Sequence, residues 1–352
     1  MINTNEMKNF WKDKSVLITG HTGFKGSWMS LLLSTLGANI IGLSNDDSTK
    51  SKLYKKNVFK KHLNKELFFD ISKENSKEYR KLSKYDFDIV FHFAAQSLVS
   101  DAKRFPYDTY KTNVLGTLNL IEYLNSLDRK ISLVVATTDK VYKNPSDTNT
   151  EEFPLEGFEF YGSSKVSVEK LIDTFLNLNP NSKLQISKVR CGNVLGGGES
   201  RQTRLLTEII EAIETNKKFI VRSANSIRPW LHILDALYGY CLTAVYLYNS
   251  GNNEVFNLSN SSEEYSVNDL VNSIMHKWDV QLDISNIKTK TYLEADILRI
   301  NSNKAKQVLG WQPIIKFEEM VDLIVDWEKG KFNLSEEKVT LNQIENFLKV
   351  LS

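Results

Sequence analysis

The sequence predicts an α/β fold: a doubly wound parallel sheet with helices on both faces, together with a smaller mixed α/β lobe in the C-terminal part. One observation about the strands and one about their spacing lead to this class. Between residues 15 and 190, short apolar runs rich in Val, Ile and Phe alternate with longer segments of helical periodicity. Strands of such composition are buried on both faces, and this burial requires helices above and below a parallel sheet.

The elements follow in a regular order. The expected strands are 15–19, 39–44, 67–70, 88–94, 133–138 and 184–190, and the main helical patterns between them are 25–36, 107–127 and 162–177. After Arg190 a Gly-rich turn, GNVLGGGE, breaks this rhythm and leads to a helix near 205–217 and the short strand FIVRS. A helix at 233–248 then precedes a strand at 254–259, which we expect to rejoin the sheet.

Length and charge restrict the class of protein. The 352 residues suffice for a sizeable core and favour two lobes over one. Lys and Arg number 45 against 43 Asp and Glu, a formal charge of +2. This balance gives no electrostatic reason to expect nucleic acid or an anionic membrane surface as a partner.

The sequence gives no targeting, membrane-spanning or metal-binding signal. The N-terminal MINTNEMKNFWKDK lacks the apolar core of a signal peptide, and the apolar stretch from Trp28 to Leu43 is interrupted by polar residues. Cys191 and Cys241 have neither CxxC nor Cys/His spacing, so we expect reduced structural thiols and no metal site. These features predict a cytoplasmic protein.

The peptide GHTGFKG directly follows the first strand and opens the first long helix. Gly20, Gly23 and Gly26 permit a tight turn, close approach of the backbone to a pyrophosphate, and close packing of helix on strand. The helix N-terminus then faces the anion, with Thr22 and Phe24 in the same loop. Such turns also occur without ligands, but this position predicts a Rossmann-type dinucleotide site.

Further cofactor contacts are expected where the next strands end. The second strand ends in GLSNDD, where Asp46 or Asp47 can accept a hydrogen bond from a ribose hydroxyl. No Arg stands there to pair with a 2′-phosphate, which favours NAD over NADP. Asp70 and Ile71 end the third strand and are placed to meet an adenine edge, although an ordinary turn is the alternative.

The fourth strand ends in FAAQS. Ala94 and Ala95 are small enough for a cofactor ribose to lie close, and we expect the Gln96 side chain to point toward the cleft. The alternative is that the two alanines only allow a helix to pack tightly on the sheet.

The fifth strand ends in an unusual group of polar residues. A strand that only had to be buried would not need the two hydroxyls, the carboxylate and the ammonium of Thr137, Thr138, Asp139 and Lys140. The carboxyl end of a strand in an open parallel sheet is where ligands bind. We therefore interpret this segment as part of a reactive site, and a surface turn as the alternative.

A Tyr-x-x-x-Lys pair follows about two dozen residues later. Tyr161 and Lys165 are four residues apart on an expected helix, so phenol and ammonium share a face and can both address one bound ribose and substrate. A nearby ammonium lowers the pKa of a tyrosine from about 10 toward working pH. Tyr107 and Lys111 have the same spacing, which we interpret as chance.

Together these segments resemble the extended short-chain dehydrogenase/reductase family, and within it the CDP-glucose 4,6-dehydratases. The resemblance covers about residues 9 to 330, through FWKDKSVLITGHTGFKGSW, FHFAAQSLV, TYKTNVLGT, TTDKVY, YGSSK, GNVLGGG, RPWLHIL and LGWQP. HTGFKGSW and TTDK are the specific segments, whereas epimerases and other nucleotide-sugar dehydratases share the rest. The resemblance implies NAD as cofactor, bound by residues 1–190 and 233–262, and a nucleotide-sugar bound by residues 191–232 and 263–352.

The resemblance also implies a role for each reactive side chain. Tyr161 would remove the proton of the sugar 4-hydroxyl during oxidation at C4, and Lys165 would hold the nicotinamide ribose. Thr138 would hydrogen-bond the 4-hydroxyl, and Thr137 would lie against the cofactor. Asp139 would protonate the departing 6-hydroxyl, a role that requires a protonated carboxyl.

Two roles remain open for Lys140, where related dTDP-sugar dehydratases have a carboxylate. As a neutral amine it would remove the C5 proton, which requires burial or neighbouring cations to lower its pKa. As a cation it would instead stabilise the enolate. Of the two roles we favour that of the base, and the local geometry decides between them.

The remaining residues follow by the same matching. Asn113 would kink its helix and anchor a water relay, with packing or capping as the alternative. Gln96, Asn193, Arg204 and Arg228 would bind the substrate, and Arg228 is best suited to a diphosphate because a guanidinium donates to two oxygens at once. His232 would support Arg228, with a structural histidine as the alternative; His62, His92 and His276 are expected to be structural, and His21 to shape the glycine loop.

The resemblance is weakest around the substrate. LVSDAKRF, GESRQTRLLTEII and GFEFYGSSK depart from the family pattern, so a dehydratase for another nucleotide-sugar, such as a GDP-linked one, is an alternative. An epimerase or 4-dehydrogenase is a second alternative, and a dinucleotide sensor without activity a third. The expected helices at 107–127 and 161–177 form a subunit interface in the family, which implies a homodimer or homotetramer.

Overall fold

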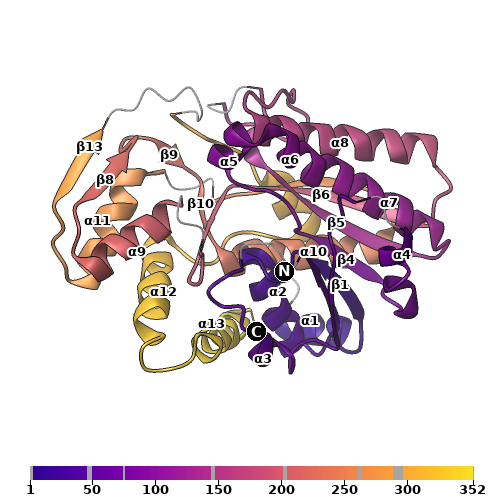
Figure 1. The fold of residues 1–352 in the computed structure, drawn as a ribbon, viewed down its shortest axis with the longest axis horizontal. Coiled ribbons are helices and arrows are strands. Elements are labelled where there is room, and N and C mark those ends of the chain that lie inside the picture. The colour runs from indigo at the N-terminus through magenta and orange to yellow at the C-terminus, as the bar shows by residue number, and fades with distance from the viewer. Residues whose placement is uncertain are drawn as a thin grey trace.

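A seven-stranded parallel sheet forms the centre of the structure, a computed structural model that describes residues 3–45, 50–73, 76–143, 147–200, 204–260, 264–287 and 296–351 (Figure 1). Its strands are β1 (Ser15–Thr19), β2 (Asn39–Ser44), β3 (Lys65–Phe68), β4 (Ile89–His92), β5 (Ile131–Thr138), β6 (Leu184–Cys191) and β11 (Val255–Leu258). They are ordered β11-β6-β5-β4-β1-β2-β3, and all neighbours are parallel. The chain therefore changes direction across the sheet between β1 and β4, the point at which open α/β sheets bind ligands.

Helices cover both faces of this sheet. One face carries α1 (Thr4–Trp11), α2 (Phe24–Thr35), α10 (Ile233–Ser250) and α13 (Glu336–Val350); the other carries α5 (Val99–Arg104), α6 (Pro106–Tyr110), the π-helical turn η2 (Lys111–Leu115), α7 (Gly116–Ser126) and α8 (Phe160–Leu178) (Figure 1). The strands alternate accordingly: Val16 and Ile18 belong to the apolar cluster under α2 and α10, and Leu17 to the cluster under α7 and α8. This double burial explains the continuous apolar runs in the sequence.

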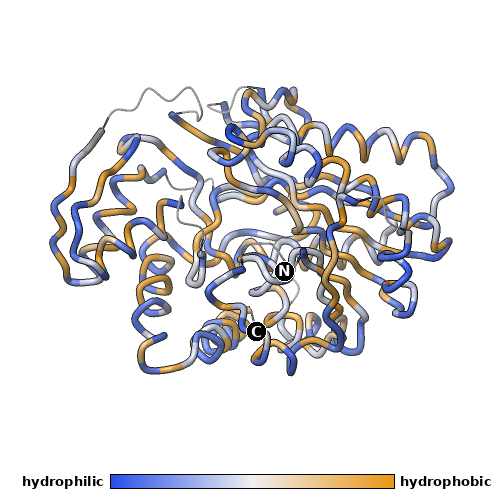
Figure 2. Tube along the Cα trace, in the orientation of Figure 1, coloured by the Kyte–Doolittle hydropathy of each residue, from blue (hydrophilic) through white to orange (hydrophobic). Residues whose placement is uncertain are grey.

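The remaining elements gather beside the carboxyl edge of the sheet (Figure 1). They are α9 (Leu205–Thr215), β7 (Asn193–Leu195) paired with β10 (Trp230–His232), β8 (Phe219–Arg222) with β13 (Ile284–Ile287), β9 (Ile227–Arg228) with β12 (Tyr265–Ser266), α11 (Val267–Trp278), η4 (Ala305–Leu309) and α12 (Phe317–Gly330). Figure 2 shows α12 alternating between hydrophobic and hydrophilic positions, as expected for a helix with one buried face. The remaining short elements are α3 (Lys56–Phe59), α4 (Ser76–Tyr79) and η1 (Leu82–Lys84).

Two tryptophans join these elements to the sheet. The indole of Trp28 on α2 donates to the carbonyl oxygen of Gly197 at 2.9 Å. The ring of Trp327 on α12 lies so close to Gly197 that a Cβ there would come within 2.1 Å of it. Trp327 also donates to Thr340 Oγ1 on α13 at 2.8 Å, so α2, α12 and α13 share one continuous apolar cluster.

The fold class is confirmed, and most elements lie where the sequence places them. The strand at 254–259 does rejoin the sheet, as β11 beside β6. The third strand was misplaced: β3 covers residues 65–68 because its partner β2 ends at Ser44, opposite Phe68. The fourth strand is shorter than expected, since it ends at His92 opposite the last residue of β1. The helical pattern at 107–127 is interrupted by the π-helical turn η2.

The expected helices at 107–127 and 161–177 lie side by side. The segment of α6 and η2 packs directly against α8 on one face of the sheet. Within the described ranges, none of the helices has the length and apolarity needed to cross a membrane.

The LGWQP segment is fastened to the start of α10 by Asp235. The buried carboxylate accepts hydrogen bonds from the backbone N–H groups of Ile314 at 2.9 Å and Ile315 at 3.1 Å. The indole of Trp311 donates to the Asp235 carbonyl oxygen at 3.0 Å. Burial raises the pKa of Asp235 to about 7, against the opposing effect of the two N–H groups.

We expect Asp235→Ala to lower the free energy of unfolding by about 2–4 kcal/mol, because it leaves two buried N–H groups without an acceptor. Urea denaturation at pH 7.5 measures the difference. Glu318→Ala, which removes an exposed carboxylate from the first turn of α12, is the control. Equal free energies of unfolding for the Asp235 variant and the wild type would show that these hydrogen bonds do not stabilise the fold.

Candidate active site

The glycine loop brings backbone from three elements into close contact. Gly20 has φ +75°, and a Cβ on it would lie 2.7 Å from the backbone nitrogen of Ala94 at the end of β4. A Cβ on Gly26 would lie 2.1 Å from the carbonyl oxygen of Gly20, so α2 packs directly on the turn. Gly23 is the N-cap of α2. The loop thus leaves the N-terminus of α2 open to the cavity beside it, as the sequence predicts.

A cavity of about 190 Å³ lies at the carboxyl ends of β1, β4, β5 and β6. It is lined by the predicted residues Gly20, Gly23, Phe24, Gly26, Ala95, Thr137, Thr138, Asp139, Lys140, Tyr161, Lys165, Asn193 and Arg204. A second cavity of about 390 Å³ shares Phe24, Lys140, Asn193 and Arg204 with the first and extends to Arg228 and Trp230. The structure therefore brings the end of β5, the Tyr161–Lys165 pair and the glycine loop to one cavity.

The polar end of β5 faces the phenol of Tyr161. The short helix η3 (Asp139–Val141) turns the chain after Thr138, whose hydroxyl donates to Asp139 Oδ1 at 3.1 Å. Burial raises the pKa of Tyr161 to about 12; the charge of Arg204 and a hydrogen bond with Thr138 act in the opposite direction. Asp139 Oδ2 is buried and has no hydrogen-bond partner within the described part of the chain.

Lys165 lies one turn after Tyr161 on α8, fully inside the protein. Its ammonium donates to the carbonyl oxygen of Ala136 at 2.9 Å. Burial and, to a smaller extent, the nearby Lys25 ammonium lower the pKa of Lys165 to about 7, against the opposing effect of Glu169. The expected lowering of the Tyr161 pKa by the neighbouring ammonium stays a prediction, because burial of the phenol outweighs the charge of Arg204 in this structure.

Asn113 is buried inside the π-helical turn η2 and does not line either cavity. Its amide nitrogen donates to the carbonyl oxygen of Gln96 at 3.0 Å and to Ser164 Oγ at 2.9 Å, and its oxygen accepts from the N–H of Gln96 at 2.8 Å. Asn113 therefore joins the end of β4 to α8 directly beside the reactive helix pair.

The prediction that Gln96 points toward the cleft is wrong. Its side-chain amide donates to the carbonyl oxygen of Leu98 at 3.0 Å, and its oxygen accepts from the N–H of Leu98 at 2.9 Å. The side chain thus closes its own turn, and Ser97 lines the cavities in its place.

Arginine and asparagine side chains dominate the polar wall of the larger cavity. Arg228 is buried and donates to the carbonyl oxygens of Ile227 at 2.9 Å and Asp296 at 3.2 Å. Arg204 donates to Ser97 Oγ at 3.2 Å, while its buried Nε has no hydrogen-bond partner among the described residues. The guanidinium groups of Arg204, Arg222 and Arg228 therefore line a cavity that also contains Asn193 and the carboxylates of Glu199 and Glu208.

Several predicted residues lie outside both cavities. Asp70 uses its carboxylate for the N–H and hydroxyl of Ser72, at 2.9 and 2.7 Å, and Ile71 is buried in the core. Thr22 is buried in the glycine loop, where its hydroxyl donates to Ser44 Oγ at 3.1 Å. Ala94 lies against Gly20 behind the loop. Asp46, with its alternative Asp47, lies outside the described residues.

Two histidines hold the loops around the site. His232 is completely buried at the N-cap of α10, where its Nδ1 accepts from the N–H of Leu234 at 3.3 Å, so its role is capping rather than substrate contact. His21 is buried against Gly42 and its Nε2 lies 2.8 Å from Glu66 Oε1. The expectation that His21 shapes the glycine loop is thereby given a physical basis.

Lys25 and Cys191 are two of the cavity residues that the sequence analysis does not single out. Lys25 lines the smaller cavity, with its Nζ 3.4 Å from the Tyr240 hydroxyl, and burial lowers its pKa. A lysine in the first turn of a helix opposes the helix dipole, and this was the signal that could have identified it. Cys191 also lines the cavity, but burial raises its pKa to about 11, so it remains a neutral thiol.

The arrangement suits acid–base chemistry on a bound polar molecule. The phenol of Tyr161, the carboxyl of Asp139 and the amines of Lys25, Lys140 and Lys165 line one cavity. The glycine loop at the N-terminus of α2 forms its opposite wall. In the described part of the chain no three His, Cys, Asp or Glu side chains are grouped to hold a metal ion.

Comparison with known sequences identifies several relatives. Residues 17–324 match the profile of a family described as GDP-mannose 4,6 dehydratase. The chain is 34% identical to a CDP-glucose 4,6-dehydratase of Salmonella typhimurium over 338 residues, which is 92% of each chain. It is 24% identical to a UDP-glucose 4-epimerase of Halalkalibacterium halodurans, over 90% of this chain and 96% of that one.

Solved structures share the fold. A dTDP-glucose 4,6-dehydratase from Bacillus anthracis, in complex with NAD, superposes with a TM-score of 0.76 at 23% identity, covering 91% of this chain and 98% of that one. A UDP-glucose 4-epimerase from Stenotrophomonas maltophila, with bound NAD and formylated UDP-arabinopyranose, superposes with a TM-score of 0.81 at 18% identity, covering 91% and 99%. At these identities the likeness establishes the fold alone.

The capping role of His232 predicts a specific dependence of stability on pH. Burial lowers the pKa of His232 to about 3, whereas histidine in an unfolded chain titrates near 6.5. The unfolded state therefore binds more protons below pH 6.5, and stability falls as the pH falls. Because Asn also caps helices, we expect His232→Asn to lose about 2 kcal/mol less than the wild type between pH 7.5 and pH 5.

Chemical denaturation at the two pH values measures this difference. His276→Asn is the matched control, because His276 is exposed in the last turn of α11 and should leave the pH dependence unchanged. A His232 variant that loses as much stability on acidification as the wild type would overturn the assignment.

Proposed function

The chain belongs to the GDP-mannose 4,6-dehydratase family, among the extended short-chain dehydrogenases/reductases, and from this premise we propose that it converts CDP-glucose to CDP-4-keto-6-deoxyglucose. It is an NAD-dependent nucleotide-sugar 4,6-dehydratase, a hydro-lyase. The observation that carries the proposal is the convergence of Thr138, Asp139 and Lys140 with Tyr161 and Lys165 in one cavity. An epimerase needs the tyrosine–lysine pair but no acid and amine for elimination.

The residues present fit a dinucleotide. The backbone contacts at Gly20 and Gly26 leave no room for a Cβ, and the N-terminus of α2 opens at the cavity, as a pyrophosphate requires. Lys165 would hold the nicotinamide ribose, and Ala95 and Thr137 would lie against the cofactor. When bound, NAD supplies the acceptor for the hydride leaving C4 and the donor for its later return to C6.

We assign the proton transfers to Tyr161, Asp139 and Lys140. Tyr161 would remove the proton of the 4-hydroxyl, while Thr138, already in contact with the phenol, would hold that hydroxyl in place. Oxidation at C4 makes the C5 proton acidic. Asp139 would then donate a proton to the 6-hydroxyl, so that water leaves and a C5–C6 double bond forms.

Lys140 is placed to act in the elimination. It is partly buried and lines both cavities, between the reactive helix and the arginine-lined wall. We propose that it removes the C5 proton, with stabilisation of the enolate by a charged Lys140 as the alternative.

The larger cavity provides a site for the nucleotide diphosphate. Arg228 and Arg204 contribute two guanidinium groups, and Asn193 lies between this cavity and the smaller one. We propose that residues 191–232 and 263–352 bind the nucleotide-sugar, and residues 1–190 and 233–262 bind NAD. Cytidine is proposed as the base because of the similarity to the CDP-glucose enzyme.

We further propose a cytoplasmic homodimer formed through α6, η2 and α8. Phe105, Leu115 and Phe160, three large apolar side chains on these elements, are each 48% exposed. The two cysteines are free and buried, as in proteins of reducing compartments.

The direct test is incubation of the enzyme and NAD with CDP-, GDP-, dTDP- and UDP-hexoses, followed by mass spectrometry for loss of water. We expect conversion of CDP-glucose, and a decrease of about 10²–10⁴-fold in kcat for Tyr161→Phe and Asp139→Asn. Tyr107→Phe is the control, since Tyr107 has the same spacing to a lysine but is 76% exposed. The absence of any dehydrated product from all four nucleotide pools would exclude the proposed activity.

Lys140→Met separates the oxidation from the elimination. If Lys140 removes the C5 proton, the variant should oxidise C4 but stop there, and absorbance at 340 nm should accumulate with CDP-glucose. We expect product formation to fall by about 10²–10⁴-fold and solvent deuterium to be absent from C5. Lys143→Met, an exposed lysine paired with Glu156, should behave as the wild type. Normal turnover of the Lys140 variant would rule out both roles.

A further inference from the structure

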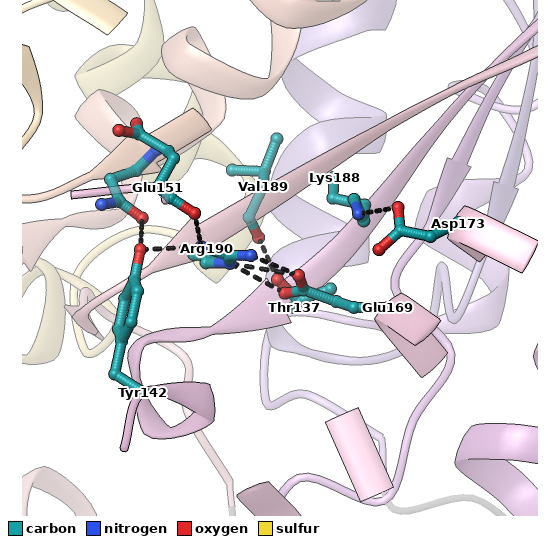
Figure 3. Close-up of polar contacts among 9 residues, drawn as sticks. Thr137, Tyr142, Glu151, Glu169, Asp173, Lys188, Val189 and Arg190 are labelled. Atoms are coloured by element: carbon teal, nitrogen blue, oxygen red, sulfur yellow. Dashed lines mark hydrogen bonds and ion pairs between the residues drawn. The ribbon is translucent and has the colours of Figure 1, made fainter. Parts of the chain in front are cut away.

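Behind the candidate active site lies a completely buried ion pair that the reaction does not use (Figure 3). Arg190 on β6 donates from Nε and a terminal nitrogen to the carboxylate of Glu169 on α8, at 3.0 and 2.6 Å. The two side chains are 3% and 0% exposed. Burial acts against the charge of Arg190, but hydrogen bonding and attraction by Glu169 outweigh it and raise its pKa.

The other terminal nitrogen of Arg190 reaches the segment that follows the reactive strand end (Figure 3). It donates to the Tyr142 hydroxyl at 2.9 Å and to the Glu151 carbonyl oxygen at 2.9 Å. The Tyr142 hydroxyl in turn donates to Asn257 Oδ1 on β11 at 2.7 Å. Tyr142 is completely buried and caps the end of η3, the helix that contains Asp139 and Lys140.

These contacts connect the two walls of the reactive cavity. Glu169 lies one turn after Lys165 and two turns after Tyr161 on the same face of α8. Arg190 pairs with Thr137 in the sheet, and Thr137 is the next-to-last residue of β5. A single guanidinium therefore holds both the helix with the base and the loop with the acid.

Stability alone is a poor explanation for this pair. Removing two charges from water costs several kcal/mol per ion, and replacing such a pair by apolar side chains of similar volume is often neutral or stabilising. Arg190 uses its fork to contact three separate segments, which apolar packing cannot reproduce. Catalysis, in contrast, is sensitive to displacements of about 1 Å between reacting groups.

We propose that Arg190, with Glu169 and Tyr142, is a positioning residue that sets the distance between the Thr138–Lys140 segment and the Tyr161–Lys165 helix. None of the three lines either of the two cavities. The proposal rests on the proposed function for its kinetic consequence, but not for its structural one.

A neighbouring ion pair provides a matched comparison (Figure 3). Lys188 lies two residues before Arg190 on β6, and its partner Asp173 lies one turn after Glu169 on α8. The Asp173 side chain is 45% exposed, and the pair contacts no residue of the loop at 139–143 in the described structure. Strand and helix are thus the same, whereas the burial of the carboxylate and the connection to η3 differ.

The test compares Tyr142→Phe and the double variant Glu169→Met/Arg190→Met with the control Asp173→Met/Lys188→Met. In hydrogen exchange followed by mass spectrometry, we expect peptides covering residues 139–143 to exchange about tenfold faster in the first two variants and unchanged in the control. Peptides from β1 and β4 should be unchanged in all three. Wild-type exchange at 139–143 in Tyr142→Phe would overturn the proposal, even if the double variant fails to fold.

Steady-state kinetics with CDP-glucose supplies the second readout. We expect kcat of Tyr142→Phe and of the Glu169/Arg190 variant to fall by about 10–100-fold with KM changed less than about threefold, and the control to match the wild type. A kcat equal to that of the wild type per folded molecule would also overturn the proposal. If the wild type itself converts no CDP-glucose, the proposed function fails, and the exchange measurement still decides the positioning role.

Discussion

All seven strands of the central sheet run in the same direction, and this one constraint determines where the chemistry lies. Parallel strands bring their carboxyl ends to one edge, so residues far apart in the chain arrive together: Gly20 after β1, Ala95 after β4, Asp139 after β5 and Cys191 at the end of β6. Because β2 and β4 flank β1 on opposite sides, the connections diverge there and leave space between them. The reactive cavity occupies that space.

Burial changes the pKa values of several cationic side chains in and behind the cavity. Lys25 and Lys165 are both enclosed beside Tyr161, and in each case burial lowers the pKa of the ammonium. Arg190 shows the opposite outcome, because Glu169 outweighs the cost of burial. The cavity therefore contains the amine of Lys165, whose pKa is lowered to about 7, and behind it lies a guanidinium whose pKa is raised.

Much of this arrangement could be predicted from the sequence, because periodicity and glycine spacing report directly on backbone geometry. The strands, the glycine loop, the polar end of β5 and the Tyr161–Lys165 helix follow from local pattern. Side-chain direction does not. Gln96 turns back on Leu98, and His232 caps a helix, because each accepts a hydrogen bond from a backbone N–H two residues later. The boundary of β3 depends on where β2 ends, and the contacts of Arg190 join four segments distant in sequence, so neither is visible in a local window.

The contacts of Trp28 and Trp327 with Gly197 limit which segments of this fold could be exchanged between related proteins. Trp28 and Trp327 approach this glycine from helices at opposite ends of the chain, and Thr340 fixes the second indole from α13. A transplanted substrate lobe that included α12 without its matching α2 and α13 would bring two mismatched aromatic surfaces together at a position with no space for even a methyl group. New specificities in this scaffold are therefore more accessible through point changes on the cavity walls than through exchange of whole segments.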